Sequence, residues 1–421
     1  MELKQVLEYQ WIGRGESVSL SDAQLAYLDR AVAACVLPAS AIEWQRNRLR
    51  FRGWCGVISF GDLTLEILPK IHGTENSPGN ARKLLVIMLS AVHKLDLRST
   101  GEAPLSLQKM VLLDLFILSF AEKLQQLVQR GIPRAYIPRE ENLNVVRGKI
   151  MVSRQIRENV CHKNRIWCGY DEFLEDTVMN RIIKITLKHL SRFARSLLVQ
   201  QKLEQLRAVY ADITDAWPCD GDWERLSFDR TNEEWQEILS QCRWFLSGMS
   251  PDIYSGSQQA ISLLFEMNML FEEYIAVELK KALRDTHDVL AQKPQKKLLQ
   301  KADGTRLFTM KPDLYVRSKA TGQPVAILDT KWKLLDAEER QMGVSQADLY
   351  QMYTYAGSYD VPQVLLLYPR QAGLDRIESR WQFTGEERGV GIVLVDLEEV
   401  LRGRRFFREG LRLFMVQGII P

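Results

Sequence analysis

The chain has 421 residues, of which 46% are hydrophobic and 26% are charged, and it contains 14 prolines. A single hydrophobic core rarely grows beyond about 250 to 300 residues, so we expect two or three domains. This composition is typical of a folded globular protein and excludes extended disorder. The formal net charge of +3 is too small to identify a partner by itself.

Neither secretion nor membrane insertion is expected. The first residues, MELKQVLEYQWIGRG, lack the basic start and apolar run of a secretory signal. The longest apolar stretches, LLVIM and LFILSF, are far shorter than the ~20 residues that span a bilayer. We therefore expect a cytoplasmic protein that makes no membrane contact. The six cysteines include no C-x-x-C pair, so we expect them to be reduced and mostly structural.

Residues 1–75 are predicted to be rich in β-strands. The segment GVISFGDLTLEILPKI alternates or runs apolar and is broken by Gly61-Asp62, a pair typical of a hairpin turn. A stretch of turn residues, HGTENSPGN, follows at 72–80 and is predicted to be a linker. We expect the part before this linker to form a separate N-terminal domain.

Two clusters of arginines are candidates for contacts with phosphates, either of nucleic acid or of a nucleotide. The first recurs at every second position, so that in a strand all side chains would project from one face; it comprises Arg46, Arg48, Arg50 and Arg52. The second lies near the C-terminus and comprises Arg402, Arg404, Arg405, Arg408 and Arg412. The alternative for the first cluster is a solvated edge strand that its charge protects from aggregation.

Residues 76–249 are predicted to be mainly helical, and residues 250–421 to form a mixed α/β domain. Helical apolar spacing fills 81–130, and the strongest helical pattern, with acids first and bases last, runs from Asp171 to Leu198. A further helix is predicted over 256–285, followed by a strand, a hairpin, a helix and a strand. The predicted fold class is therefore α+β with several domains, bounded at 1–75, 76–249 and 250–421.

Three charged residues lie in the segment KPDLYVRSKATGQPVAILDTKWK, which is otherwise predicted to be a buried β-hairpin. If its two strands pair symmetrically about Thr321, Asp313 lies opposite Asp329, and a bulge would shift this register by one residue. Opposed carboxylates repel each other, so a buried pair must share a proton or hold a cation. Lys331 follows Asp329 by two positions and therefore projects from the same face of the strand.

Two acids and an amine that converge are suited to phosphodiester hydrolysis. The carboxylates would hold one or two Mg²⁺ ions, which polarise the phosphate and activate a water. The lysine would orient or deprotonate that water and stabilise the developing charge. The alternative is a surface ion pair between Asp329 and Lys331 at a strand end, with Asp313 merely starting the other strand.

Helices on either side of the hairpin offer further candidates. Gln351 and Tyr355 are one turn apart and lie on one face of the downstream helix. The upstream helix contains Glu272 and Glu273 in LFEEY, where a carboxylate could complete the shell of a metal ion. The alternative for this pair is an exposed pair of helical acids.

These residues resemble those of a known family. PD, a spacer and D-x-K resemble the signature of the PD-(D/E)xK nuclease superfamily, and Gln351 with Tyr355 resembles the Q-x-x-x-Y helix of some of its branches. More narrowly, MNMLFEEY, KPDLYV, ILDTKWK, SQADLYQMYTYA and VLLLYP, in that order, are similar to McrC, the nuclease subunit of McrBC modification-dependent restriction systems. With the match at YDEFLEDTVMNRIIKITLKHL, the resemblance covers about residues 140–370. The segment ISFGDLTLEILPKI suggests the longer form of McrC, which has an added β-rich domain.

The resemblance implies a Mg²⁺-dependent DNA endonuclease. Its catalytic residues would be Asp313, Asp329, Lys331, Gln351 and Tyr355, and its metal ligands Asp313, Asp329 and Glu272. Substrate binding would involve double-stranded, methylated DNA, and the two arginine clusters remain candidates for phosphate or partner contacts.

The resemblance also implies a partner of the McrB type, an AAA+ GTPase that forms hexamers and reads the modified base. In this family the N-terminal part enters the partner's central pore and stimulates GTP hydrolysis, so residues 1–75 are the expected contact. The chain contains no G-x-x-x-x-G-K-[ST], so we do not expect it to hydrolyse nucleotides with a P-loop of its own.

Two other functions remain open. The chain could be a PD-(D/E)xK nuclease of another defence or repair system, or a non-catalytic regulator of an AAA+ partner. The filled acidic and lysine positions argue against the regulator.

Overall fold

The computed structural model describes residues 2–33, 37–60, 63–71, 77–93, 110–162, 164–230, 232–247, 260–333, 335, 343–370 and 379–419. The chain divides into two compact units, one of Met1–Gly101 with Asp252–Pro421 and one of Glu102–Pro251. The segments that we assigned to the first and third domains thus lie mainly in one unit. Helices and several sheets occur together, as the α+β class predicted. In the described ranges, no helix is long and apolar enough to cross a membrane.

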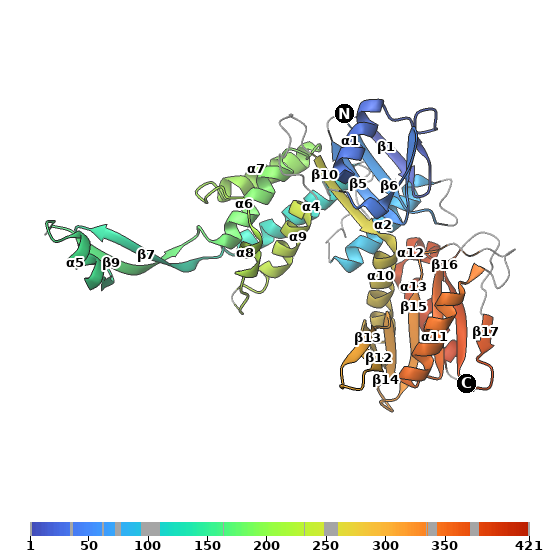
Figure 1. The fold of residues 1–421 in the computed structure, drawn as a ribbon. Coiled ribbons are helices and arrows are strands. Elements are labelled where there is room, and N and C mark those ends of the chain that lie inside the picture. Colours follow the sequence, from blue (N-terminus) through green and yellow to red (C-terminus); the bar gives the residue numbers. More distant parts are fainter. Residues whose placement is uncertain are drawn as a thin grey trace. The chain divides into compact units, whose positions relative to one another are not determined.

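The N-terminal part of the first unit is built on a four-stranded sheet (Figure 1). Its strands follow the order β1 (Glu2–Leu7), β6 (Leu63–Leu68), β5 (Trp54–Phe60) and β10 (Ala260–Glu266). β5 and β6 pair antiparallel, which confirms the predicted hairpin, although its turn at 61–62 lies outside the described residues. All side chains of β6 are buried, so this sheet forms the centre of the N-terminal core.

A three-stranded sheet and a helix share this core. The strand order is β2 (Ile12–Gly13), β4 (Arg48–Phe51) and β3 (Ile42–Gln45), with the turn η1 (Ala39–Ala41) leading into β3. Leu49 and Phe51 of β4 pack with Leu28 of α1 (Asp22–Ala33) in the same hydrophobic cluster. The alternative for the first arginine cluster was an edge strand that its charge protects from aggregation. This alternative is wrong, because β4 is the central strand of its sheet.

Strand β10 corrects a second prediction. We expected one helix over 256–285, but α10 (Met267–Ala282) begins only after residues 260–266 have paired antiparallel with β5. A Cβ on Gly56 of β5 would lie 2.0 Å from the carbonyl oxygen of Leu263, so glycine is required for this close pairing. The apolar run AISLLF is therefore buried in a sheet whose other strands lie about 200 residues away in the sequence.

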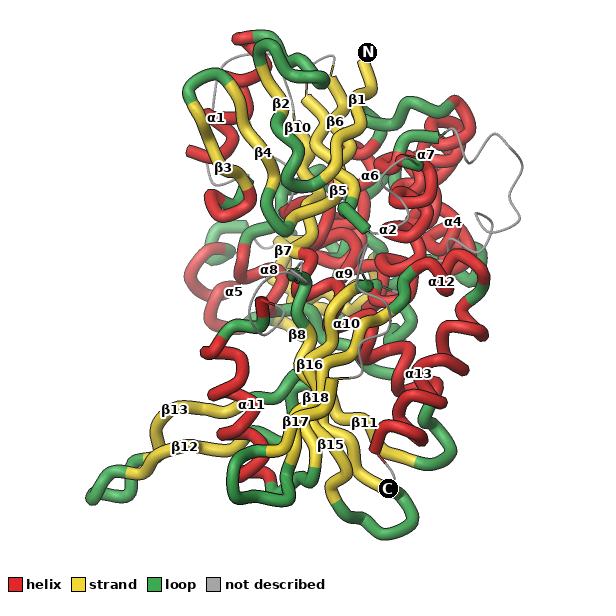
Figure 2. The backbone as a smooth tube through the Cα atoms, turned by 90° about the vertical axis from the view of Figure 1, so that its right-hand side faces the viewer, coloured by secondary structure: helices red, strands yellow, loops and turns green. Residues whose placement is uncertain are grey.

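The C-terminal part of the first unit is built on a six-stranded mixed sheet (Figure 2). The strand order is β11 (His287–Ala291), β14 (Leu314–Ser318), β15 (Pro324–Thr330), β16 (Gln363–Pro369), β18 (Gly389–Val395) and β17 (Ser379–Gln382). β15, β16 and β18 are parallel, and the other strands are antiparallel to their neighbours. Parallel strands are covered on both faces, which explains the continuous apolar runs in β15 and β16.

Helices cover both faces of this sheet. On one face, α11 (Gln346–Tyr359) packs Met352 and Ala356 into the cluster that contains Ile327 and Val364 of the sheet. Figures 1 and 2 show α13 (Arg404–Ile419) on the opposite face from α11. α13 follows the short α12 (Glu398–Arg402) and contacts α10, which in turn contacts α2 (Pro78–Val92). The predicted order of strand, hairpin, helix and strand is confirmed.

Between β11 and β14 the chain leaves the six-stranded sheet. It forms a separate two-stranded sheet from β12 (Lys296–Gln300) and β13 (Arg306–Met310), which we call the basic hairpin and define as residues 292–311. Figure 2 shows the two strands leading away from the six-stranded sheet. After the hairpin the chain reaches Asp313, which directly precedes β14.

The second unit contains a helical bundle. The bundle is made of α4 (Leu112–Val128), α6 (Val178–Leu190), α7 (Leu197–Val209) and α9 (Trp235–Ser247), and the short α8 (Asp220–Glu224) lies in the connection between α7 and α9. The prediction of one helix from Asp171 to Leu198 is wrong at both ends, because β9 continues to Leu174 and α6 ends at Leu190. Thr177 caps α6 by accepting a hydrogen bond from the backbone of Asn180, and pairing with β7 keeps the preceding acids in a strand.

An arm leads away from this bundle (green in Figure 1). It consists of β7 (Ala135–Leu143) paired along its whole length with β9 (Ile166–Leu174), with β8 (Lys149–Ile150) on the other side of β9. The short helix α5 (Val152–Glu158) lies in the connection between β8 and β9. Most side chains of the arm are exposed or half-buried, so its strands hold each other rather than packing on a core.

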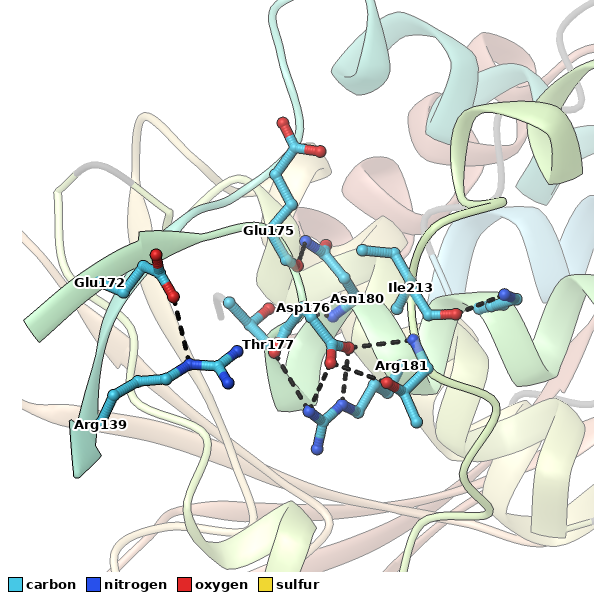
Figure 3. A network of polar contacts seen from close by, with 10 residues as sticks. Arg139, Glu172, Glu175, Asp176, Thr177, Asn180, Arg181 and Ile213 are labelled. Carbon is cyan, nitrogen blue, oxygen red and sulfur yellow. Dashed lines mark hydrogen bonds and ion pairs between the residues drawn. The ribbon is translucent and has the colours of Figure 1, made fainter. Parts of the chain in front are cut away.

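A polar network fixes the root of the arm (Figure 3). Asn180 is fully buried, and its amide donates to the carbonyl oxygens of Pro133 and Glu175, at 2.8 and 2.7 Å. Those two residues stand at the base of the two long strands, so one side chain ties both to α6. Beside it, Asp176 accepts two hydrogen bonds from Arg181, which lower the pKa of its carboxyl well below the usual range.

Candidate active site

Asp313 and Asp329 meet at the ends of β14 and β15. The strands pair Leu314 with Leu328, so the register predicted about Thr321 is confirmed and Asp313 directly precedes this first pair. A bulge does occur, but nearer the turn, between Val316 and Arg317, and it shifts the pairing there by one residue. Asp329 is only 1% exposed, and the strand residues before it are buried, so the core holds its carboxylate in place.

Lys331 projects to the same face as Asp329, as predicted. Its Nζ lies 2.7 Å from Oδ2 of Asp329 and 3.8 Å from Oδ1 of Asp348 in α11. Its backbone N donates to the carbonyl oxygen of Leu367 at 2.9 Å, which continues the pairing of β15 with β16. Because Asp329 is buried, the alternative of a surface ion pair does not describe this contact.

Thr330, the residue between Asp329 and Lys331, positions Asp313. Its backbone N and its hydroxyl donate to Oδ2 of Asp313, at 2.8 and 3.0 Å. The first carboxylate is therefore fixed by the strand that carries the second. This role was not predicted, although a hydroxyl residue at the central position of D-x-K is a signal that could have indicated it.

The two carboxylates are electrostatically strained. Burial and the charge of Asp313 raise the pKa of Asp329 from 3.8 to about 7, despite the opposing effect of Lys331. Burial also raises the pKa of Asp313, against the hydrogen bonds from Thr330. Burial disfavours the charged form of Lys331, but the attraction of Asp329 outweighs it and raises the pKa of this amine. The site thus holds more negative charge than one ammonium group compensates.

Glu272 approaches Asp313 without joining the two aspartates in a cluster. Burial and the charge of Asp313 raise the pKa of Glu272, and its Oε1 accepts a hydrogen bond from Nε2 of Gln292 at 2.9 Å. Burial also raises the pKa of Glu273. In the part of the chain that the structure describes, no group of three or more His, Cys, Asp or Glu side chains is placed to hold a metal ion. The structure therefore brings together the aspartates but does not bring Glu272 into a three-ligand group.

Gln351 and Tyr355 lie on one face of α11, as their spacing predicted, and they contact the strand before Asp313. Nε2 of Gln351 donates to the hydroxyl of Tyr355 at 3.1 Å, and that hydroxyl donates to the carbonyl oxygen of Lys311 at 3.2 Å. The charges of both aspartates contribute, after burial, to the raised pKa of Tyr355. In this geometry the pair positions the backbone that leads into Asp313.

Trp332 connects the same strand to the N-terminal sheet. Its backbone N donates to Oδ1 of Asn268 at 3.0 Å, and its indole Nε1 donates to Oε1 of Glu8 at 2.9 Å. The backbone N of Lys70 donates to the same oxygen at 3.0 Å. Glu8 is 1% exposed, and burial raises its pKa from 4.5 to about 7. No spacing in the sequence relates residue 8 to residue 332, so this contact could not be predicted.

The first arginine cluster is largely neutralised within the chain. Three of its guanidinium groups form ion pairs at 2.8 to 3.1 Å, and two of these also lie 4.5 Å from the centre of the Trp11 ring. The pairs are Arg48 with Glu16, and Arg50 and Arg52 with Glu43. Arg46 lies in the turn between β3 and β4, so the four do not form one strand face.

The second arginine cluster mainly docks α13. Arg404 donates to the carbonyl oxygen of Ile87 in α2 at 2.9 Å, and Arg408 bonds the buried carboxylate of Glu278 in α10 at 2.5 Å. Arg405 has an exposed side chain, and among the described residues it pairs with Glu409 of its own helix alone, at 3.3 Å. Of the two predicted phosphate contacts here, Arg405 is the one whose side chain remains accessible.

Comparison with known proteins agrees with this picture. The family model described as McrBC 5-methylcytosine restriction system component matches residues 49–369. A search of curated proteins gives no match. The fold is similar to that of a chain in the refined half-complex of Thermococcus gammatolerans McrB AAA+ hexamers with bound McrC, with a TM-score of 0.70 and 21% identity over 97% of this chain and 99% of that one.

A second solved structure is also similar. A chain of the Thermococcus gammatolerans McrBC complex has a TM-score of 0.53 and 21% identity, over 67% of this chain and 88% of that one. At this identity the two structures support the fold alone. The family model, in contrast, matches well over half of the sequence. The chain belongs to the family of McrBC 5-methylcytosine restriction system components.

Proposed function

We propose that this chain is the nuclease subunit of a modification-dependent restriction complex. In this proposal it hydrolyses phosphodiester bonds of methylated double-stranded DNA with Mg²⁺, and it binds and stimulates an AAA+ GTPase of the McrB type. The observation that carries the proposal is the convergence of Asp313, Asp329 and Lys331 at the ends of two adjacent strands. A mixed sheet with helices on both faces supports assignment of this part to the PD-(D/E)xK superfamily.

The residues of the site fit a divalent cation. Two buried carboxylates with raised pKa values repel each other, and a cation between them would remove that repulsion. An all-oxygen donor set suits Mg²⁺ better than the softer transition metals. Asp313 and Asp329 would hold the ion, which would supply a Lewis acid for the phosphate and an activated water.

The electrostatics favour one of the two predicted roles of Lys331. Ion pairs with Asp329 and Asp348 stabilise the charged form of the amine, which is a poor acceptor for the proton of an attacking water. A charged ammonium is suited to stabilising negative charge on the phosphate and to orienting the water. Contacts with Asp329 and Asp348 hold it for this task.

The tip of the arm supports a second part of the proposal, the contact with the AAA+ partner. Large apolar side chains on it are 40 to 74% exposed, which is unusual for a soluble surface that has no partner. They are Val145, Val146, Ile150, Val152, Ile156 and Val160. The fold resembles that of a chain in a complex of McrB hexamers with bound McrC, so we assign this tip to the partner.

The N-terminal domain remains a proposed partner contact as well. Residues 1–75 cannot be deleted cleanly to test it, because β5 pairs with β10 and Glu8 bonds Trp332. Point variants at Arg46, which lies in a turn, leave these contacts intact.

The catalytic part is tested with the purified chain, the AAA+ protein encoded beside it, GTP, Mg²⁺, and methylated or unmethylated DNA. We expect Asp329→Ala to abolish cleavage and to leave GTPase stimulation intact, because its side chain lies in the C-terminal sheet. Asp285→Ala, at an exposed position, is the matched control and should cleave normally. Persistent cleavage by Asp329→Ala would contradict the assigned site, and no cleavage by the unaltered complex would contradict the nuclease function.

The partner contact is tested with Val145→Ser, Val146→Ser and Ile156→Ser combined. Burial of such side chains contributes roughly 1 kcal/mol each, so partner affinity should fall about a hundredfold. The control combines Leu197→Ser, Leu198→Ser and Val209→Ser, whose side chains on α7 are 74, 50 and 45% exposed. Equal GTPase stimulation by both variants would show that the tip does not contact the partner.

A further inference from the structure

The basic hairpin, residues 292–311, is exposed on both of its faces. Every side chain of β12 is exposed, and so are the apolar residues Leu298, Leu299 and Phe308, at 46, 54 and 68%. A two-stranded sheet with no core beneath it is only marginally stable by itself. Leu298, Leu299 and Phe308 are therefore not explained by packing on a core within the hairpin.

The hairpin carries an unusual excess of positive charge. It contains six basic residues and one acidic residue, so its net charge of about +5 exceeds the +3 of the whole chain. The basic residues are Lys293, Lys296, Lys297, Lys301, Arg306 and Lys311, and all six are exposed. None of them forms an ion pair with an acid of the described ranges, whereas both arginines of β4 and several arginines of the arm are paired. Lys296 bonds the carbonyl oxygen of Ser358 and lies over the ring of Tyr359, and Lys297 bonds Thr309, but no carboxylate of the described ranges neutralises the positive charge of the hairpin.

The root of the hairpin is fixed beside the candidate active site. The hydroxyl of Tyr359 contacts the carbonyl oxygens of Pro294 and Met310, at 2.7 and 3.1 Å, and thereby holds both strands. The backbone N of Gln292 donates to the carbonyl oxygen of Asp313 at 2.8 Å. At the other end, Lys311 is held by Tyr355 and is two residues from Asp313. The root of the hairpin thus lies beside the pair of aspartates.

The charge of the site itself explains why such an element is needed. Buried carboxylates repel an approaching phosphate, and this repulsion is strong where water is excluded. A basic surface beside the site offsets this repulsion and raises the local concentration of a polyanion. An acidic protein that bound the hairpin would have no need to reach Asp313, whereas a phosphodiester that is to be cleaved must reach it. The position of the hairpin therefore favours a nucleic acid as its ligand.

We propose that the basic hairpin binds the backbone of double-stranded DNA and places a phosphodiester at Asp313 and Asp329. This inference rests on the proposed nuclease function for its substrate. Phe308 adds to the surface, since it is a largely exposed aromatic residue held at a φ of +54°, a conformation that such residues rarely adopt. Strained residues of this kind concentrate at binding sites.

The test measures binding of the full-length chain to a labelled DNA duplex without Mg²⁺, over a range of salt concentrations. The variant combines Lys297→Gln, Lys301→Gln and Arg306→Gln, which leave the root untouched. The control combines Lys83→Gln, Lys280→Gln and Arg284→Gln, which are exposed positions in the same unit and remove the same charge. Both variants lower the net charge equally, so their difference isolates the hairpin.

We expect the hairpin variant to bind DNA about tenfold to a hundredfold more weakly at roughly 0.15 M salt, and the control to change little. The slope of log K against log salt should fall by roughly 2 to 3, since each lost phosphate contact removes about 0.9. Lys301→Gln alone should lower this slope by about one third as much as the triple variant does. Equal binding and equal slopes for the two triple variants would overturn the inference.

Two further outcomes would also overturn it. If the unaltered chain does not bind the duplex, the hairpin is not a DNA-binding element. If DNA binding is unchanged but association with the AAA+ partner falls, the hairpin binds an acidic protein surface instead. Because binding is measured without Mg²⁺, a failure of the nuclease proposal, seen as cleavage by Asp329→Ala, is distinguishable from a failure of this inference.

Discussion

The contact between Glu8 and Trp332 leads to a quantitative prediction for Glu8→Gln. Glutamine keeps an oxygen that can accept hydrogen bonds from the Trp332 indole and the Lys70 backbone, and it removes the charge. The other carboxylate oxygen, Oε2, is buried and has no hydrogen-bond partner in the described part of the chain. Ionisation of Glu8 therefore costs more in the folded protein than in the unfolded chain.

The size of the effect follows from the pKa of Glu8. Burial raises it from 4.5 to about 7, so the folded state holds the proton more tightly. The stability that this provides is fully present below the unfolded pKa and is lost as the pH rises through the folded pKa. One pKa unit corresponds to about 1.4 kcal/mol, so the unaltered chain should lose about 2.5 kcal/mol from this group between about pH 5 and pH 8. Glu8→Gln should not lose it.

The assay is urea unfolding of the unaltered chain and of Glu8→Gln at both pH values. All other groups titrate alike in the two proteins, so the change in their stability difference reports Glu8 alone. Glu387→Gln, at an exposed position, is the control and should show no such change. The reasoning is refuted if the stability difference between the unaltered chain and Glu8→Gln is the same at pH 5 and pH 8.

Two other predictions concern positioning. Tyr355→Phe removes the hydrogen bond to the carbonyl oxygen of Lys311, so it should cost about 1 kcal/mol of stability and lower kcat for DNA cleavage, while partner GTPase stimulation measured in the same samples stays unchanged. Asn180→Ala leaves the carbonyl oxygens of Pro133 and Glu175 without their donor and should cost about 2 to 4 kcal/mol. Hydrogen exchange in the arm should then accelerate, and unchanged exchange would show that the root does not depend on Asn180.

The register of β14 and β15, which carry the candidate active site, could be predicted because it depends on local rules. A strand has a period of two, and the centre of a hairpin determines which residues oppose each other. These two rules are enough to place Asp313, Asp329 and Lys331 on one face, and the observed pairing of Leu314 with Leu328 agrees. The spacing of Gln351 and Tyr355 places them on one helix face for a similar reason.

The failures share a different physical cause, which is pairing with distant segments. The apolar pattern of AISLLFE is compatible with a buried helix or a buried strand. The segment is a strand because it pairs with β5. The acids from Asp171 resemble the first turn of a helix, but nine residues of β7 hold them in a strand. Likewise, the spacing of the arginines at 46–52 could not reveal that Glu16 and Glu43 neutralise most of them.

These distant contacts make the N-terminal sheet and the candidate active site difficult to separate. β10 completes that sheet and continues without a break into α10, whose first residue, Met267, donates its backbone N to the carbonyl oxygen of Gly53 at 2.7 Å. The next residue, Asn268, accepts a hydrogen bond from the backbone N of Trp332. The indole of Trp332 in turn donates to Glu8, which directly follows β1 of the N-terminal sheet. A displacement of the sheet therefore reaches the strand of Lys331 by two routes. In the proposed complex, a partner that binds the N-terminal domain would act on Lys331 through these contacts, without touching it.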